Sequence, residues 1–422
     1  MPEGHAGVYD PAMIRFTTAL CCSVLLCATA LSCSGTGRAE GPGGARATAS
    51  RANIAEARTI VAAMDDDELV GQLLMIGIDG VSRLSQASQD NLRAVRPGAI
   101  LLFGYNVSDK PAMLAGLLAQ VRDAAGVRGL PPFIAIDHEG GSVYRFKGGL
   151  TRLPSAKALG AAGDEAARVA GSVAGSELLA LGVTMNLAPV VEALSEANRA
   201  FLVDRAWSTD PAAAGRLAAE FIGACQSQGV AACAKHFPGN GHADPHEALP
   251  VIAAAKPELQ RQYYEPFRQA VNGGVAAIMM SHALLQAVDQ KTPASLSAPV
   301  IAELKIGLGF SGIVLTDDLV MAALGKAGGP GAAAVAALSA GADMLMVSGG
   351  PAVELVRRAV RAALADGRLP RERLKDAATR IVAQKVRFGL ASATEADRES
   401  RLAALEQTVS HNRAALAKAL AH

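Results

Sequence analysis

From residue 69 onward the chain repeats one unit, in which a short apolar run precedes a Gly- or Pro-containing loop and an amphipathic stretch of helical period. The eight apolar runs are Leu69–Ile78, Pro97–Phe103, Pro132–Asp137, Val183–Val191, Val230–His236, Val275–Ser281, Gly312–Asp317 and Ala342–Ser348. Continuous apolar strands joined by helices are typical of a parallel sheet buried on both faces. Eight right-handed crossovers close such a sheet into a (β/α)8 barrel, and an open, doubly wound sheet is the alternative.

The placement of polar residues favours the barrel. Charged and hydrogen-bonding side chains collect at the ends of several runs, at Asp137-His138-Glu139, Lys235-His236, Ser281-His282, Asp317-Asp318 and Ser348. A barrel builds its active site from the carboxyl ends of many strands, whereas an open sheet concentrates such groups at one switch point. We therefore predict one α/β domain of the TIM-barrel type over residues 53–392, followed by a helical tail over residues 393–422.

Charge and cysteine usage exclude other classes. Lys and Arg number 40 against 39 Asp and Glu, so the formal net charge is +1. That balance lacks the basic excess that nucleic-acid binding needs, and we expect no nucleic-acid partner. Four of the six cysteines lie at Cys21, Cys22, Cys27 and Cys33, which leaves no disulfide framework for the domain.

The N-terminus has the pattern of an export signal. A basic start at Arg15 precedes an uncharged apolar stretch from Phe16 to Ser32, which is too short for a comfortable membrane span. Ala30-Leu31-Ser32-Cys33 resembles the lipobox of bacterial lipoproteins. We expect residues 1–33 to be a signal peptide and the protein to be exported to the cell envelope, with its only membrane contact a lipid on Cys33. Cleavage nearby, with release to the periplasm or the outside, is the alternative.

Residues 34–52 are rich in Gly, Ala and Ser and predict a flexible tether between this signal and the domain.

The loop from Ala234 to Pro250 holds three histidines, a lysine and an aspartate among Gly and Pro residues. His242, Asp244 and His246 are a conceivable metal-ligand set, but their spacing matches no zinc signature. In the other interpretation Asp244 accepts a hydrogen bond from one ring nitrogen of His246, and the second ring nitrogen exchanges protons. The sequence favours this acid/base pair.

The apolar run before Leu319 delivers two carboxylates at its end. Asp317 is the last residue of the run, and we predict that it points into the mouth of the barrel. Asp318 has the opposite strand parity, which predicts a role in orienting the next segment. Glycoside cleavage uses a carboxylate that faces a proton donor across a pocket. A carboxylate at a strand end can instead cap a helix.

Five separated motifs together resemble glycoside hydrolase family 3, specifically its single-domain β-N-acetylglucosaminidase branch. In chain order they are Asp137-His138-Glu139-Gly140-Gly141 with Arg145-Phe146, Asp204-Arg205, Lys235-His236-Phe237-Pro238-Gly239, Asp244-Pro245-His246 and Thr316-Asp317-Asp318-Leu319. The resemblance covers roughly residues 55 to 390. The chain departs from the family pattern at Asn240, where histidine is common, and at His138, where glutamine is frequent.

The resemblance implies a retaining β-N-acetylhexosaminidase without a metal or other cofactor, acting as a monomer. Its substrate would be terminal β-linked N-acetylglucosamine on peptidoglycan fragments or chitin-type oligosaccharides. Asp317 matches the nucleophile that forms a covalent glycosyl-aspartate, and His246 with Asp244 matches the general acid/base. The residues that match the sugar-binding positions are Asp137, Arg145, Arg205, Lys235 and His236.

Three other functions remain open at this stage. A family 3 β-glucosidase usually takes its acid from a second domain, and the Lys-His and Asp-x-His elements favour the aminosugar branch instead. A metal-dependent hydrolase would centre on the loop from His236 to His246. A sugar-binding lipoprotein without activity would have no use for a proton-delivering pair. The single tryptophan, Trp207, is expected in the core rather than in the site.

Overall fold

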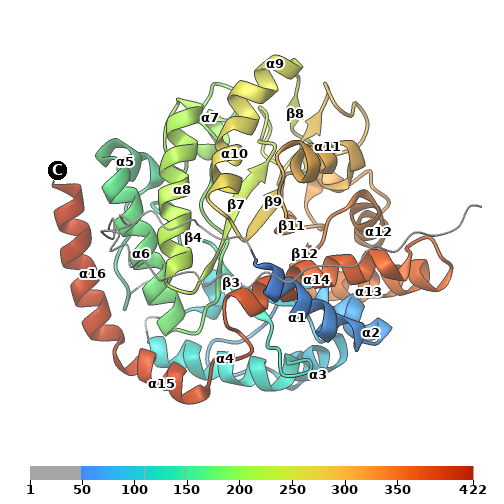
Figure 1. The fold of residues 1–422 in the computed structure, drawn as a ribbon, viewed down its shortest axis with the longest axis horizontal. Coiled ribbons are helices and arrows are strands. Elements are labelled where there is room, and N and C mark those ends of the chain that lie inside the picture. The colour runs from blue at the N-terminus through green and yellow to red at the C-terminus, as the bar shows by residue number, and fades with distance from the viewer. Residues whose placement is uncertain (1–48, 109, 147, 422) are drawn as a thin grey trace, which may run out of the picture. The chain divides into compact units, whose positions relative to one another are not determined.

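The computed structural model describes residues 49–421 except 109 and 147, and its centre is a sheet of eight parallel strands (Figure 1). In spatial order the strands are β11 (Ile313–Thr316), β9 (Ala277–Met280), β7 (Ala231–Phe237), β6 (Met185–Asn186), β3 (Phe133–Ile136), β2 (Ala99–Leu102), β1 (Leu74–Gly77) and β12 (Leu345–Val347). The first and last strands of this order also meet, because Leu315 forms a parallel bridge with Met344. The sheet closes through this short contact, and the predicted (β/α)8 barrel is confirmed.

Each barrel strand is followed by a helix on the outside of the barrel (Figure 1). In chain order these helices are α3 (Gln86–Val95), α4 (Pro111–Ala125), α6 (Asp164–Ala180), α8 (Pro211–Ser227), α10 (Glu265–Asn272), α11 (Ala298–Ala302), α12 (Pro330–Ala340) and α13 (Gly350–Ala365). The other helices are α1 (Arg51–Ala62), α2 (Asp66–Gln72), α5 (Ala156–Ala162), α7 (Arg199–Leu202), α9 (Lys256–Glu258), α14 (Arg371–Arg387), α15 (Glu395–Ala403) and α16 (Leu405–Leu420).

Short elements decorate the connections. Strands β4 (His138–Gly140) and β5 (Val143–Tyr144) form an antiparallel hairpin, and β8 (Val251–Ile252) pairs in parallel with β10 (Leu284–Leu285). Turns of 3-10 or π pitch are η1 (Gly104–Asn106), η2 (Leu259–Tyr264), η3 (Ala294–Leu296), η4 (Glu303–Gly307) and η5 (Ala322–Leu324).

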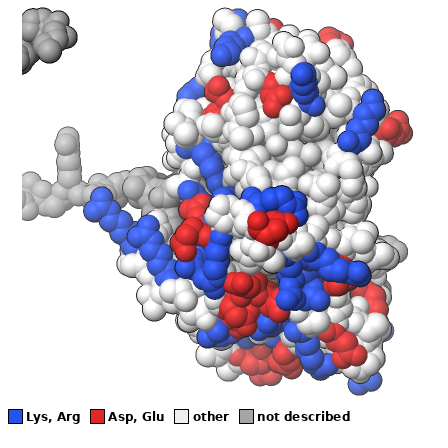
Figure 2. All heavy atoms as spheres, turned by 90° about the vertical axis from the view of Figure 1, so that its right-hand side faces the viewer, with Lys and Arg blue, Asp and Glu red and all other residues white. Residues whose placement is uncertain are grey.

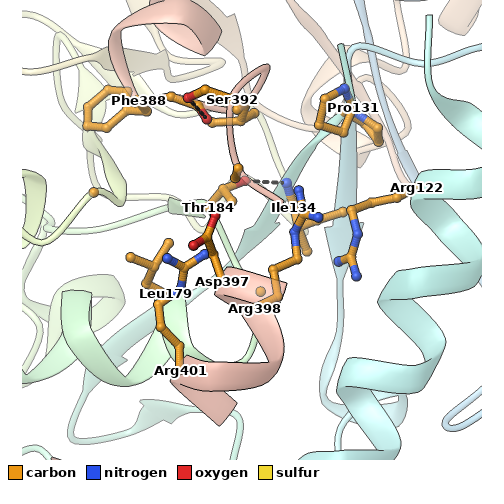
Figure 3. Close-up of a pocket in the computed structure, with 16 residues that line it drawn as sticks. Arg122, Pro131, Ile134, Leu179, Thr184, Phe388, Ser392, Asp397, Arg398 and Arg401 are labelled. Carbon is orange, nitrogen blue, oxygen red and sulfur yellow. Dashed lines mark hydrogen bonds between the residues drawn. The ribbon is translucent and has the colours of Figure 1, made fainter. Parts of the chain in front are cut away.

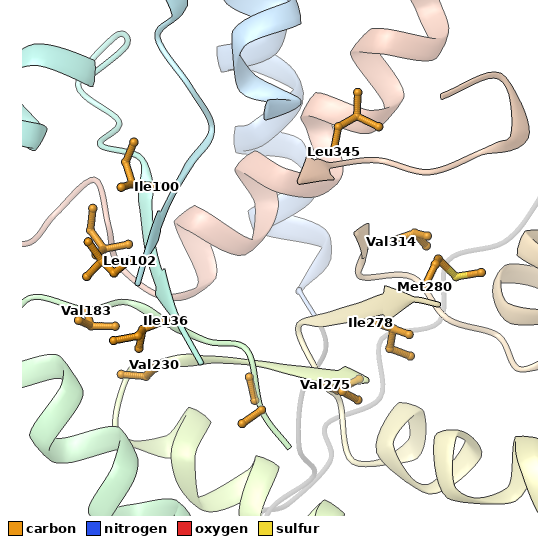
Figure 4. Close-up of a cluster of buried hydrophobic side chains, with 14 of the residues drawn as sticks. Ile100, Leu102, Ile136, Val183, Val230, Val275, Ile278, Met280, Val314 and Leu345 are labelled. Carbon is orange, nitrogen blue, oxygen red and sulfur yellow. The ribbon is translucent and has the colours of Figure 1, made fainter. Parts of the chain in front are cut away.

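Alternate strand residues face opposite sides of the barrel wall, as the two-residue period of a strand requires. The inward set fills the barrel interior and includes Met75, Ala99, Leu101, Phe133, Ala135, Met185, Ala231, Cys233, Ala277, Met279, Ile313, Leu315 and Met346. The outward set packs beneath the helices and includes the side chains of Ile100, Leu102, Ile136, Ile278, Val314 and Leu345 (Figure 4). Burial on both faces explains why the strands are continuous apolar runs in the sequence.

The first predicted strand, Leu69–Ile78, extends too far toward the N-terminus, because its first four residues belong to helix α2. Asp65 starts this helix: its side chain accepts from the Glu68 N–H at 2.7 Å, and Glu68 accepts from the Asp65 N–H at 3.0 Å. The helix buries Leu69 and Val70 directly before the strand begins. The apolar pattern therefore hides the boundary between the two elements.

The fourth predicted strand, Val183–Val191, is regular only over Met185–Asn186. The rest of the run stays alongside β7, where the Val191 N–H donates to the Lys235 carbonyl at 2.9 Å. Pro189 lacks an N–H group and cannot take part in a regular ladder as a donor. The run was predicted in the right place, but most of it is irregular.

The predicted tail forms two helices, α15 and α16, separated by Ala404. Helix α16 packs against α6, where the buried Glu177 carboxylate accepts from the Thr151 hydroxyl at 2.6 Å and from the Asn412 amide at 2.9 Å. At the other end, α1 begins at Arg51, so the last residues of the predicted tether are helical.

The predicted signal peptide, Cys33 and residues 34–48 of the tether lie outside the described residues. Within the described part of the chain, no helix combines the length and hydrophobicity that crossing a membrane requires.

Basic and acidic side chains are interspersed on the face of the molecule in Figure 2. Ion pairs between surface elements include Arg361 with Asp67 at 2.7 Å and Arg371 with Asp66 at 2.6 Å. That face therefore lacks the continuous basic surface on which nucleic-acid binding depends.

Candidate active site

Three side chains at the carboxyl ends of barrel strands face the barrel axis, as the inward-facing residues of the same strands do. Asp137 follows β3, Lys235 lies near the end of β7, and Asp317 follows β11, each two positions after an inward-facing residue. Strand alternation therefore directs all three toward the barrel axis. This direction agrees with the prediction that the Asp317 side chain points into the mouth of the barrel.

An ion-pair network joins several of the predicted site residues. The Lys235 ammonium lies 2.6 Å from Asp137 Oδ1 and 2.8 Å from Glu139 Oε1. Arg205 donates two hydrogen bonds to the Glu139 carboxylate, at 2.8 and 2.9 Å, and Arg145 lies 3.4 Å from Asp137 Oδ2. The structure thus brings together Asp137, Arg145, Arg205 and Lys235 around Glu139, which the sequence analysis had not placed in the site.

The carboxylates of Asp137 and Glu139 and the ammonium of Lys235 are charged at neutral pH. Burial raises the pKa of the Glu139 carboxyl, but Lys235 and Arg205 outweigh it and lower that pKa to about 2. Burial also raises the pKa of Asp137, and Lys235 again holds it below its ordinary value. The pKa of Lys235 is raised, because the two carboxylates outweigh its own burial.

The carboxylates of Glu139 and Asp137 differ in their exposure to solvent, which indicates different roles. The Glu139 side chain is 5% exposed, whereas the Asp137 side chain is 21% exposed and the Arg145 side chain 35%. Glu139 is thus an internal anchor that fixes Lys235 and Arg205. Asp137 and Arg145 remain open to a molecule that enters the barrel mouth.

The β4–β5 hairpin carries Glu139 and Arg145 and depends on two glycines. Gly140 and Gly141 have φ values of +92° and +54°, in the left-handed region where glycine carries no steric penalty. A Cβ on Gly141 would also lie 2.8 Å from Asp204 Oδ2. This tight turn places Glu139 beside Lys235 and directs the chain back toward Asp137.

His236 is held by a second buried carboxylate, Glu192. Glu192 Oε1 lies 2.9 Å from His236 Nδ1, and Oε2 accepts from the Asn240 N–H at 2.8 Å. The Asn240 amide group also donates to Oε1 at 3.0 Å. The asparagine that departs from the family pattern therefore fixes the start of the 234–250 loop. Phe201 packs over His236, with ring centroids 5.9 Å apart.

The predicted acid/base pair is present as a direct contact. Asp244 Oδ1 lies 2.7 Å from His246 Nδ1 and also accepts from the His246 backbone N–H at 2.9 Å. Burial raises the pKa of Asp244, but these hydrogen bonds outweigh it and leave the carboxyl below its ordinary value. An ionised carboxylate only accepts hydrogen bonds, so Nδ1 carries the proton and Nε2 is the ring nitrogen that points away from Asp244.

The 234–250 loop contacts the segment that follows β11. The Pro245 carbonyl accepts from the Ala323 N–H at 3.3 Å, and Ala323 lies in turn η5 after Asp317. The Phe201 ring, which also packs against His236, lies 6.5 Å from the His246 ring between centroids. These contacts hold the Asp244–His246 pair on the side of the barrel where Asp317 ends its strand.

Asp317 sits in a tightly bonded turn. Its backbone N–H donates to the Met280 carbonyl at 3.0 Å, which extends the β9–β11 ladder to this residue. Its Oδ1 accepts from the Asp318 N–H at 2.8 Å, which fixes the carboxylate plane. The Asp318 side chain accepts from the Val320 and Ser348 N–H groups, at 3.3 and 3.2 Å. The prediction that Asp318 orients the next segment is thus confirmed.

His282 supports this turn from the end of β9. Its Nε2 lies 3.0 Å from the Asp318 carbonyl and its Nδ1 lies 2.7 Å from the Ser295 hydroxyl. Burial lowers the pKa of His282 even though the Asp317 carboxylate opposes this effect. The ring is therefore neutral, with the proton on Nε2, since only a donor can bond to a carbonyl.

Other sequence expectations concern metal ligands and Trp207. Among the described residues, no three His, Cys, Asp or Glu side chains are arranged to hold a metal ion. Trp207 is 4% exposed and packs against Phe221, so its predicted place in the core is confirmed. Glu192, missed in the sequence, carried a usable signal, because it directly follows the apolar run Val183–Val191.

The sequence matches one family model, the glycosyl hydrolase family 3 N-terminal domain, over residues 66–384. The chain belongs to glycoside hydrolase family 3. Family 3 relatives named beta-hexosaminidase include one from Thiobacillus denitrificans, 38% identical over 288 residues that cover 66% of this chain and 78% of the relative. Another, from Methylobacillus flagellatus, is 34% identical over 280 residues, covering 63% and 78%.

Solved family 3 structures resemble the whole barrel. A β-N-acetylglucosaminidase from Paenibacillus sp. FPU-7 superposes with a TM-score of 0.75 at 35% identity, covering 82% of this chain and 68% of that chain. NagZ from Neisseria gonorrhoeae, solved in complex with N-trifluoroacetyl-D-glucosamine, superposes with a TM-score of 0.67 at 28% identity, covering 83% and 97%.

Proposed function

We propose that this family 3 chain is a retaining β-N-acetylhexosaminidase that releases terminal, non-reducing β-linked N-acetylglucosamine. The observation that carries the proposal is the Asp244–His246 pair, held over the same end of the barrel at which Asp317 ends strand β11. A carboxylate and a proton donor at one pocket suit glycoside cleavage with retention. The names of the family 3 relatives, beta-hexosaminidase and β-N-acetylglucosaminidase, support the same substrate class.

In the first step, an Asp317 carboxylate oxygen attacks the anomeric carbon of the sugar. The bond from that carbon to the leaving oxygen breaks, and the leaving oxygen takes the proton from His246 Nε2. His246 enters this step as the imidazolium, whose positive charge Asp244 balances. The ring becomes neutral when Nε2 gives up its proton, and Nδ1 keeps its proton and its hydrogen bond to Asp244. The product is a glycosyl-aspartate on Asp317.

In the second step, the neutral Nε2 of His246 takes a proton from water, whose oxygen attacks the anomeric carbon. The bond from the sugar to Asp317 breaks, and the carboxylate is restored. Two inversions at one carbon leave the sugar with its original anomeric configuration. The ion-pair network holds the sugar meanwhile, since Asp137 and Arg145 are its exposed members and form charge-assisted hydrogen bonds with hydroxyl groups.

Two aryl glycosides test the substrate class. We expect release of 4-nitrophenol from the β-N-acetylglucosaminide to exceed release from the β-glucoside by at least tenfold in kcat/KM. Asp317→Asn should abolish turnover, and a 5-fluoro glycosyl fluoride of N-acetylglucosamine should label Asp317 in the wild type. Asp318→Asn is the matched control for the label. Label on Asp318, or preference for glucose, would contradict the proposal.

We also propose that the enzyme is exported and anchored by lipid at Cys33, in reach of peptidoglycan fragments or chitin-type oligosaccharides. The support is the sequence pattern Ala30-Leu31-Ser32-Cys33 after an apolar stretch. Stable anchoring takes more than one acyl chain, which lipoprotein modification supplies. Detergent phase partitioning should place the wild type in the detergent phase and Cys33→Ala in the aqueous phase. A wild type wholly in the aqueous phase would contradict the anchor and leave the hydrolase activity untouched.

A further inference from the structure

A cavity of about 370 Å³ lies outside the barrel wall, near the end opposite to the active site. Its walls include Ile134 at the start of β3, Thr184 just before β6 and Gly229 just before β7. These are amino ends of strands, whereas Asp137, Lys235 and Asp317 lie at carboxyl ends. The outer wall is the segment after α14, including Phe388, together with helix α15.

Three arginines line this basal cavity. Figure 3 shows Arg122 on α4 at one side, and Arg398 and Arg401 on α15 at the other. Asp397 is the one acidic side chain among the lining residues, and its Oδ2 is already engaged by the Thr394 hydroxyl at 2.7 Å. The lining therefore carries excess positive charge.

The three arginines differ in how well they are neutralised. Arg122 and Arg398 share one carboxylate, Glu395, at 3.1 and 3.0 Å. Burial lowers the pKa of Arg122, and repulsion from Arg398 lowers it further, so Glu395 does not fully compensate this pair. The Nε–H of Arg401 is buried and has no hydrogen-bond partner within the described part of the chain. A buried donor without an acceptor is destabilising, and a bound anion would supply the missing acceptor.

The remaining lining is largely apolar. Ile134, Leu179, Phe388 and Leu390 present hydrocarbon surface to the cavity, and Thr184 has its hydroxyl engaged by the Ile134 N–H at 2.9 Å. The volume lies within the range of small-molecule sites, and such sites combine apolar walls with a few polar groups that fix orientation. A bare inorganic ion would leave the apolar walls unfilled.

We propose that the basal cavity binds a small organic anion whose carboxylate or phosphate group meets Arg401 and Arg398 and whose apolar body lies against Phe388 and Ile134. Guanidinium groups bind both kinds of anion through paired N–H donors. The site is separate from the glycosidase site and does not depend on that activity.

Isothermal titration calorimetry on the full chain tests this site with phenyl phosphate, benzoate, inorganic phosphate and phenol, each with N-acetylglucosamine present to fill the active site. We expect phenyl phosphate or benzoate to bind at one equivalent, at least tenfold more tightly than phenol or inorganic phosphate. Arg401→Gln should weaken binding at least tenfold. Ser392→Trp, which fills the cavity from its rim without removing charge, should abolish binding. Arg58→Gln, at an exposed arginine of α1, is the matched control and should change nothing.

Circular dichroism and turnover of the aryl glycoside check that the variants are folded, since none of these residues belongs to the active site. Equal binding of inorganic phosphate and phenyl phosphate would mean an adventitious ion only and would overturn the proposal. Binding that survives both Arg401→Gln and Ser392→Trp would overturn it as well. So would the absence of binding by both phenyl phosphate and benzoate.

Discussion

The proposed proton donor and nucleophile stand in contrasting surroundings. The His246 side chain is 67% exposed on a loop, whereas Asp317 is bonded into the end of strand β11. Asp244 fixes the orientation of the His246 ring on this exposed loop, because it accepts hydrogen bonds from both the ring and the backbone of His246. A general acid contributes most when the leaving group is poor.

His246→Ala is therefore expected to lower kcat/KM by about 10²–10⁴ on an N-acetylglucosamine disaccharide. The loss should be less than about tenfold on the 2,4-dinitrophenyl glycoside, whose leaving group needs no proton. His242→Ala, at an exposed histidine of the same loop, is the matched control and should be nearly silent. Equal losses on both substrates would assign His246 a structural role.

Single residues were predictable where strand parity applies. Asp317 and Asp318 are adjacent in sequence but face opposite sides, and alternation alone separated an inward carboxylate from one that orients the next segment. Glu139 and Glu192 were not assigned, because their importance comes from partners that are distant in sequence. Glu139 meets Arg205 across 66 positions and Glu192 meets His236 across 44. The position of Glu192 directly after an apolar run marks it as a candidate site residue, but no local pattern identifies the partner of either carboxylate.

At the scale of elements, seven of the eight barrel strands fall within predicted runs, and β7 extends one residue past its run, to Phe237, because burial on both faces marks the strands clearly. Their ends were less predictable. The helix α2 and strand β1 are both apolar, so only the Asp65–Glu68 capping pair marks the change from one to the other. The division of the tail into α15 and α16 likewise depends on packing against other helices.

Among the contacts that hold helix α16 against α6, the Asn412 amide donates to the buried Glu177 carboxylate at 2.9 Å. Asn412→Leu removes this hydrogen bond, which is worth about 1.5–3 kcal/mol for a charged acceptor. We expect amide hydrogen exchange in α16 to speed up by at least tenfold, while exchange in the barrel strands stays unchanged. Glu406→Gln, at an exposed position of α16, is the control. Uniform acceleration over the whole domain would show that α16 does not open separately.

For the molecule as a whole, one buried cation at the base of the barrel links stability to pH. Lys385 is fully buried, with its ammonium 2.9 Å from Gln72 Oε1, and burial lowers its pKa to about 7. In the unfolded chain a lysine titrates near pH 10.4, so between about pH 7 and 10 the unfolded state binds more protons. The contribution of Lys385 to the free energy of unfolding therefore rises with pH between about pH 7 and 10 and is lowest below pH 7.

Lys385→Met should accordingly raise the free energy of unfolding most at pH 6, with the gain shrinking steadily toward pH 9. Urea unfolding of both proteins at pH 6, 7, 8 and 9 measures this difference. Lys326→Met, at an exposed lysine, should give the same difference at every pH. A constant difference for Lys385→Met as well would mean that Lys385 keeps its charge throughout.

The buried charges of the network that we propose to bind the sugar are paired inside the protein before any substrate arrives. Lys235 and Glu139 are 3% and 5% exposed and 2.8 Å apart, a separation far below the distance over which dissolved ions screen charge at physiological salt. The sugar itself is uncharged. Added salt should therefore weaken neither the ion pairs of the network nor the association of the uncharged substrate. An enzyme built this way keeps its affinity for substrate constant as the ionic strength of its surroundings changes.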